Sequence, residues 1–130
     1  MAIDLSKLAV VSSEAFDVKL NHPATGEQLF DGDKAVAITI LSKTSEEYRS
    51  MLATQQNARL KRTKNSALTI EELTKDGNDL LTAVTVGSSG LSYKGTEDIN
   101  FKELYADPEM AWLKDQVYVA LEDNANFLAV

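Results

Sequence analysis

The spacing of apolar residues changes after residue 41, and this change limits the folds that the chain can adopt. Over about residues 14–41 apolar side chains occupy alternate positions, as Phe16, Val18 and Leu20 do, which is the period of strands with one buried face. From residue 44 they recur at every third or fourth position, which is typical of amphipathic helices. This order predicts an α+β fold: a small N-terminal antiparallel sheet or hairpin followed by three to four helices, mainly α.

Turn-forming residues divide the strand region. Residues 21–26 (NHPATG) contain proline and glycine, and residues 31–33 (DGD) are expected to form a second turn or bulge. A return strand is expected to start at residues 28–30. The clearest strand is residues 35–41 (AVAITIL), whose second face carries small side chains. We therefore expect both faces of this strand to be partly covered.

Capping residues predict where the helices begin. Thr44 and Glu47 form one capping box, and Thr69 and Glu72 form another. Asp107 before proline is a typical N-cap. The expected helices span about residues 44–65, 69–86, 99–105 and 108–124.

Apolar stripes predict the buried faces of two of these helices. The stripe of the second helix consists of Ile70, Leu73, Leu80, Leu81 and Val84. Gly77 lies on the same stripe, where it costs roughly 1 kcal/mol relative to alanine, so it is expected to allow close packing or a kink. Residues 87–90 (GSSG) are expected to end this helix. The stripe of the last helix consists of Leu113, Val117, Ala120 and Leu121.

Length and composition fit a single domain over residues 1–130. Hydrophobic residues make up 44% and charged residues 25% of the chain, as in ordinary globular proteins. No apolar run approaches the ~20 residues of a membrane helix, and the N-terminal segment is unlike a signal peptide. The chain has no cysteine, which favours a reducing compartment. We therefore expect a cytoplasmic protein without membrane contact.

Residues that could carry catalysis or hold a cofactor are sparse. The absence of cysteine excludes thiolate zinc sites and cysteine nucleophiles. The one histidine, His22, lies in a turn before proline and is expected to cap the local backbone. Residues 31–33 lack the ligand pattern of a calcium loop, and the glycines near Gly87 fit no phosphate-binding motif. We expect no enzymatic activity, and no catalytic, cofactor-binding or metal-binding residues.

Positive charge is concentrated at the end of the first predicted helix. The net charge is −7, yet four of the 13 basic residues lie close together: Arg59, Lys61, Arg62 and Lys64. The rest of the chain is strongly acidic, which argues against nucleic-acid binding. Because the second half of this helix also loses its apolar stripe, the basic segment either projects into solvent or docks on a charged partner or a second copy.

The chain ends on apolar residues, including Phe127, Leu128 and Val130. Docking of this end onto its own domain is favoured, since terminal segments often tie down the last helix. Contact with a neighbouring chain is the alternative. Phe127 and Leu128 are therefore candidate self-association residues together with the basic segment.

Several short motifs, in order, resemble the tail assembly chaperones of long-tailed, siphovirus-type bacteriophages. The resemblance covers most of the chain from about Phe16. Its most specific part is the turn over residues 20–27 (LNHPATGE) followed by residues 45–49 (SEEYR). The further matching segments are residues 59–62 (RLKR), 80–81 (LL), 86–87 (VG) and 123–127 (DNANF). Ser88 and Ser89 replace the tryptophan and acidic residue that the family pattern has after the glycine.

This resemblance implies a non-enzymatic role in virion assembly. Such chaperones act in the host cytoplasm, bind the tape measure protein, self-associate into a spiral or ring, and are absent from the mature virion. A longer form made by translational frameshifting recruits the tail tube protein. Two alternatives stay open: a head–tail joining or tail completion protein, and, less favoured, a small nucleic-acid-binding regulator.

Overall fold

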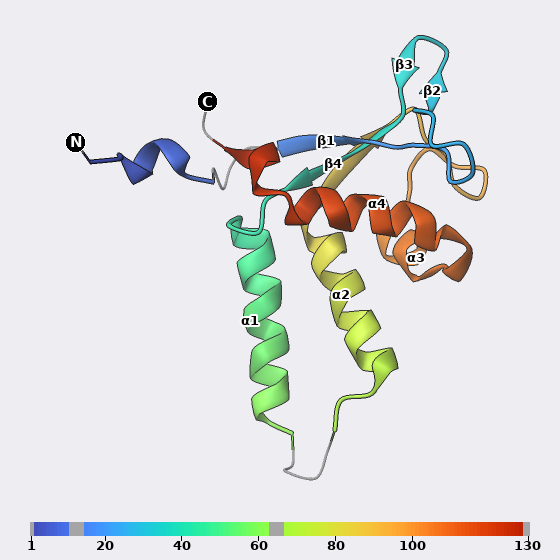
Figure 1. Ribbon diagram of the computed structural model, residues 1–130. Helices are drawn as coiled ribbons and strands as arrows, with labels where there is room; N and C mark the ends of the chain where they lie inside the picture. Colours follow the sequence, from blue (N-terminus) through green and yellow to red (C-terminus); the bar gives the residue numbers. More distant parts are fainter. Residues whose placement is uncertain (1, 11–14, 63–66, 129–130) are drawn as a thin grey trace.

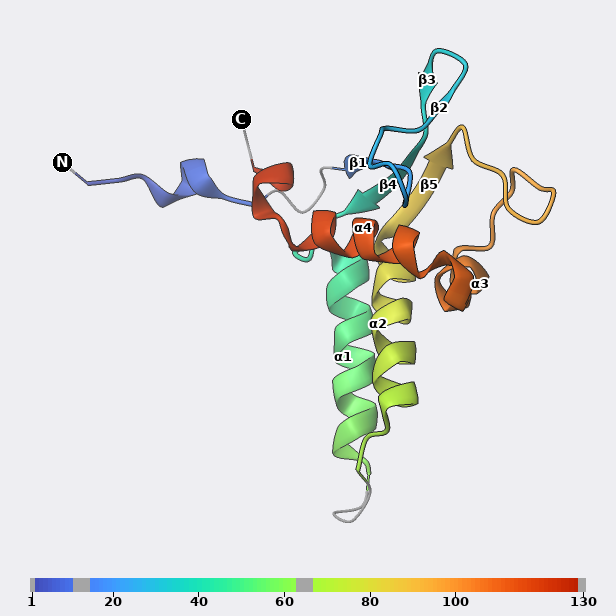
Figure 2. The ribbon, with the colours of Figure 1, turned by 45° about the vertical axis from the view of Figure 1, so that its right-hand side comes forward.

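The computed structural model describes residues 2–10, 15–62 and 67–128. Its centre is a three-stranded antiparallel sheet in the order β1-β4-β5, of which Figure 1 labels β1 and β4 and Figure 2 labels all three strands. The strands are β1 (Ala15–Lys19), β4 (Ala37–Leu41) and β5 (Thr85–Ser89). A second, two-stranded sheet pairs β2 (Phe30–Asp31) with β3 (Lys34–Ala35).

Four α-helices and three short 3₁₀ helices complete the described part of the chain. The α-helices are α1 (Glu46–Leu60), α2 (Ile70–Val84), α3 (Phe101–Ala106) and α4 (Ala111–Glu122). The 3₁₀ helices are η1 (Leu5–Leu8), η2 (Pro108–Met110) and η3 (Asn124–Phe127). The expected α+β class, with small antiparallel sheets and four α-helices, is confirmed.

The core lies between the sheet and the helices that cover it. Helix α4 runs alongside the sheet, whereas α1 and α2 extend away from it side by side (Figures 1 and 2). The sheet region contributes Val18, Leu20, Val36, Ile38 and Ile40 to this core. The helices contribute Leu81, Val84, Leu104, Tyr105, Leu113, Val117, Leu121 and Phe127. The predicted buried face of the last helix is thus confirmed at three of its four stripe positions, since its fourth residue, Ala120, is only partly buried.

The predicted strand over residues 35–41 is divided between the two sheets: Ala35 belongs to β3 and residues 37–41 form β4. It is interrupted at Val36, whose carbonyl accepts a hydrogen bond from Leu20 N (3.0 Å) and whose N–H donates to Leu29 O (3.1 Å). Residues 31–33 form the tip of the β2–β3 hairpin, where Gly32 takes a positive φ of 63°, as glycine does in tight hairpin turns. Ala37 is buried, so the expected cover of the second strand face is confirmed there.

The predicted cap of the first helix is one residue early. Ser45 is the N-cap, and its Oγ accepts a hydrogen bond from Tyr48 N (3.3 Å). Its hydroxyl donates to Ser42 O (2.6 Å), and this buried contact fixes the serine in the capping position. The helix ends at Leu60 rather than 65. The Thr69 cap is confirmed by the bond from Glu72 N to Thr69 Oγ1 (3.1 Å).

Two further boundaries differ from the prediction. Helix α2 ends at Val84, and residues 85–89 form the edge strand β5 instead of a helix end and turn. The reason is tertiary, because β5 pairs with β4, which is more than forty residues away in the chain. The last helix begins with the 3₁₀ turn η2, where Asp107 is the predicted cap, and α4 follows from Ala111.

Candidate protein-binding surface

Helices α1 and α2 form a hairpin that leaves the body of the protein (Figure 2). At the end near the sheet its side chains join the core, as Leu81 and Val84 do. At the far end large apolar side chains are exposed instead: Leu60 is 83% and Ile70 is 82% exposed. The hairpin therefore presents apolar surface at a distance from the hydrophobic core.

Polar contacts join the two helices along the projecting part. Gln55 is the buried residue of α1, and its Nε2 donates to the carbonyl of Asp76 in α2 (2.8 Å). One turn further along α1, Arg59 Nη2 lies 3.0 Å from the Asp76 carboxylate. One buried amide and one partly exposed ion pair thus replace the apolar contact that a helical hairpin commonly has.

Arg62 extends the same contact beyond the end of α1. Its guanidinium forms an ion pair with Glu72 and donates to Ala67 O (3.1 Å). The hydrogen bond from Arg62 is the main reason that the pKa of Glu72 lies below its usual value. Arg59 and Arg62, predicted as partner-binding residues, therefore contact α2 of their own chain. The sequence signal for this pairing is the acidic i, i+4 pair Glu72 and Asp76 on α2.

Helix α2 has an apolar face that is distinct from this acidic face. Leu81 and Val84 of the predicted stripe are buried, but Leu73 is 48% exposed and Ile70 is 82% exposed. The expectation of one continuous buried face is therefore wrong for the first half of α2. An added Cβ at Gly77 would meet nothing within 4 Å, so the close packing expected there is absent. The stripe leaves the core and continues into solvent because no element among the described residues buries Ile70 and Leu73.

The other predicted contact residues have different surroundings. Lys61 is exposed at the end of α1, and Lys64 lies outside the described residues. Phe127 is 1% exposed, and its ring packs edge-on against Phe16 with 5.9 Å between the centroids. Docking of the C-terminal segment on its own domain is thus confirmed for Phe127, which offers no free surface to a partner. Leu128 is partly buried and forms an isolated β-bridge with Val10.

His22 has the local role expected from its position in a turn. Its Nδ1 accepts hydrogen bonds from Ala24 N (3.1 Å) and Thr25 N (3.3 Å). Within the described ranges, no group of three or more potential metal ligands comes together. No helix in the described part of the chain is long and apolar enough to cross a membrane.

Comparisons with known proteins identify no relative. A scan against known protein families finds no match, and searches of curated proteins and of solved structures find none. The geometry of the α1–α2 hairpin is therefore the main structural basis for inferring a function.

Proposed function

We propose that this chain is a non-enzymatic tail assembly chaperone that binds the tape measure protein through its α1–α2 hairpin. The proposal combines the sequence resemblance with one structural observation: the apolar stripe of α2 continues into solvent at Leu73 and Ile70. Exposed apolar surface beside charged residues is typical of sites that bind another protein.

A helical client suits this surface. Ile70 and Leu73 lie three residues apart on the exposed apolar face of α2, so an amphipathic helix laid along α2 can cover both, as in helix-in-groove recognition. Leu60 adds a second exposed apolar side chain at the end of α1. The hairpin also carries charges of both signs, which can pair with the polar flanks of such a client. A long helical protein in need of protection before tube assembly is a client of this kind.

The proposal includes the other properties that the resemblance implies. The chaperone acts in the host cytoplasm, associates with further copies of itself, and leaves before the virion is complete. Recruitment of the tail tube protein belongs to a longer, frameshifted form.

Co-expression with the tape measure protein of the same phage tests client binding. Wild-type chain is expected to keep the client soluble and to co-purify with it. A variant with Leu60→Asp, Ile70→Asp and Leu73→Asp should lose both effects, since charges on an apolar contact must be desolvated. Val86→Asp, at a residue 56% exposed on β5, is the matched control and should retain them.

Two results contradict the proposal. The first is an insoluble client in the presence of well-folded wild-type chain, and the second is full activity of the triple variant. Mass spectrometry of purified particles distinguishes the proposed chaperone from a head–tail joining protein, because a joining protein stays in the particle whereas a chaperone does not.

A further inference from the structure

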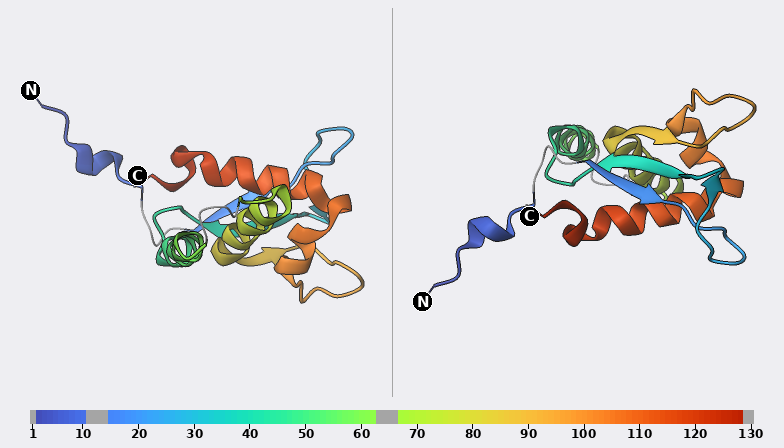
Figure 3. Two further views of the ribbon diagram at one scale, coloured as in Figure 1. Left: turned by 90° about the horizontal axis from the view of Figure 1, so that it is seen from below. Right: turned by 90° about the horizontal axis from the view of Figure 1, so that it is seen from above.

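The N-terminal arm, residues 2–10, carries apolar side chains without a core of its own. Ile3 is 79%, Leu5 is 75% and Leu8 is 57% exposed. The arm extends away from the body in all views (Figures 1 and 3). Its root is attached to the domain by the β-bridge between Val10 and Leu128.

Local hydrogen bonds give the arm a defined shape. Asp4 caps η1, since its carboxylate accepts bonds from Ser6 N (3.1 Å) and Ser6 Oγ (2.6 Å). A 3₁₀ helix has three residues per turn, so Leu5 and Leu8 lie on one face. A capped turn with an apolar face in solvent is suited to docking, because part of the ordering cost is met before binding.

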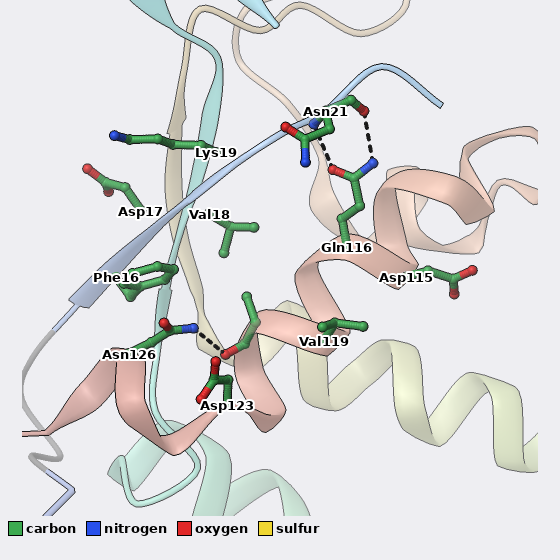
Figure 4. A pocket seen from close by; sticks show the side chains of 11 residues that line it. Phe16, Asp17, Val18, Lys19, Asn21, Asp115, Gln116, Val119, Asp123 and Asn126 are labelled. Carbon is green, nitrogen blue, oxygen red and sulfur yellow. Dashed lines mark hydrogen bonds between the residues drawn. The ribbon is translucent and has the colours of Figure 1, made fainter. Parts of the chain in front are cut away.

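The domain has an open apolar groove that matches the arm. It lies between β1 and α4, has a volume of about 640 Å³, and is lined by Phe16, Val18, Val119 and Ala120 (Figure 4). Val119 is 68% exposed although it is a large apolar residue in the middle of a helix. Strand β1 pairs only with β4 among the described strands, so the edge beside the groove is open.

The groove is formed before anything binds. At one end the side chain of Gln116 exchanges two hydrogen bonds with the backbone of Asn21, from Asn21 N to Oε1 and from Nε2 to Asn21 O, both 2.8 Å (Figure 4). At the other end Asn126 Nδ2 donates to Ala120 O (3.0 Å). The Gln116–Asn21 contact joins the end of the strand to the helix, and the Asn126 bond holds η3 against the end of α4.

Charge favours the arm as the occupant. Two acidic residues, Asp115 and Asp123, line the groove on its helical side. Asp17 and Lys19 border it from β1, but their side chains point to the other face of the strand, where the Asp17 carboxylate accepts a bond from Thr39 Oγ1 (2.6 Å). The arm carries Lys7 beside its apolar face, so an arm in the groove brings a cation to an acidic rim. Because the arm points away from its own domain, the groove that it meets belongs to another molecule.

We propose that the arm of one copy docks in the β1–α4 groove of a second copy. This inference rests on the self-association included in the proposed function and names the two surfaces that carry it. The donor and acceptor surfaces differ, so each copy can give one arm and receive another. Arms passed from copy to copy build rings or filaments, and reciprocal exchange of two arms closes a twofold dimer.

The oligomeric mass in solution tests this contact. An arm of nine residues, 2–10, buries less surface than a standard interface, so the mass of wild-type chain by light scattering should rise with concentration. Leu5→Asp with Leu8→Asp removes the donor surface. Val119→Arg removes the acceptor surface, while its guanidinium, four residues from both Asp115 and Asp123, supports the helix. Each variant alone is expected to be monomeric.

Mixing the two variants gives the decisive result. The arm variant retains a groove and the groove variant retains an arm, so a 1:1 mixture should form heterodimers of twice the monomer mass and nothing larger. Val86→Asp and the hairpin triple variant should assemble like wild type, which separates failure of this inference from failure of client binding. A monomeric wild-type chain, unchanged assembly of either variant, or a mixture that stays monomeric overturns the inference.

Discussion

Tyr105 is the largest fully buried side chain of the described residues, and its hydroxyl has one polar neighbour. Tyr105 OH lies 2.8 Å from Thr85 Oγ1, and that threonine hydroxyl donates to Leu81 O (2.7 Å). Because the hydroxyl proton of Thr85 is already donated to Leu81 O, Tyr105 OH is the donor and Thr85 Oγ1 the acceptor of the bond between them. Burial raises the pKa of Tyr105 from 10.0 to about 12.

This raised pKa makes folding stability depend on alkaline pH. Below about pH 10 the phenol is neutral in both states, and its contribution is fully present. Between about pH 10 and about pH 12 the unfolded chain releases the proton and the folded chain keeps it, so the unfolding free energy should fall by about 2–3 kcal/mol. Urea unfolding at a series of pH values measures this fall.

Tyr105→Phe is the matched comparison for the pH series. It should be less stable by about 1 kcal/mol near neutral pH, because Thr85 loses its donor. Its alkaline decline should be shallower than that of wild type. Parallel declines in the two proteins would contradict the role assigned to Tyr105.

Residue-scale predictions from the sequence succeeded where the interaction is local. Capping at Thr69 and the backbone contacts of His22 involve partners within three residues. The error at Thr44 has a different cause, since Ser45 is held by a buried bond to Ser42 that the capping-box pattern does not contain.

At the scale of elements, the buried side-chain amide of Gln55 contributes more to the contact between α1 and α2 than the ion pair between Arg59 and Asp76 does. Gln55 is 7% exposed, and its Nε2 bond to Asp76 O leaves little access to water. The side chains of the Arg59–Asp76 pair are 39% and 24% exposed, so solvent screens their attraction.

Gln55→Ala should therefore destabilise the protein by about 1–2 kcal/mol, since a buried hydrogen bond and its packing are lost. Arg59→Ala should cost less than about 1 kcal/mol, and high salt should diminish the difference from wild type. Urea unfolding compares both with Gln56→Ala, a change at the exposed neighbouring glutamine. Equal effects of the two glutamine substitutions would show that the interhelical amide contact contributes nothing measurable.

At the scale of the whole molecule, the C-terminal segment closes the core against the first strand. Phe127 in η3 is 1% exposed and meets Phe16 of β1 edge-on, with 67° between the rings. The contact joins segments from opposite ends of the described chain. It also lies beside the groove proposed to receive the arm.

Phe127→Ala should destabilise the domain by about 3–5 kcal/mol, as large-to-small changes of buried aromatic residues do. Phe30→Ala is the matched control, because Phe30 is 59% exposed and its truncation creates no cavity. Thermal and urea unfolding of both variants measure the difference. Similar losses in the two would mean that the C-terminal segment is not part of the cooperative core.

The sequence by itself determined the order of the strands and helices before residue 85, two helix caps and most core positions. Periodicity and capping depend on neighbours within one turn or one strand, so they are visible in the chain alone. Only the tertiary structure decided that residues 85–89 form a strand, because their hydrogen-bonding partners lie in β4.

The tertiary structure also decided what is exposed. The pattern of α2 is the same at Ile70 and Val84, yet one is 82% exposed and the other is buried, since burial depends on where neighbouring elements end. Arg59 and Arg62 turn toward α2 because its carboxylates stand opposite them in the folded hairpin. A sequence pattern describes which face is apolar, and only the packing of other elements determines whether that face is covered.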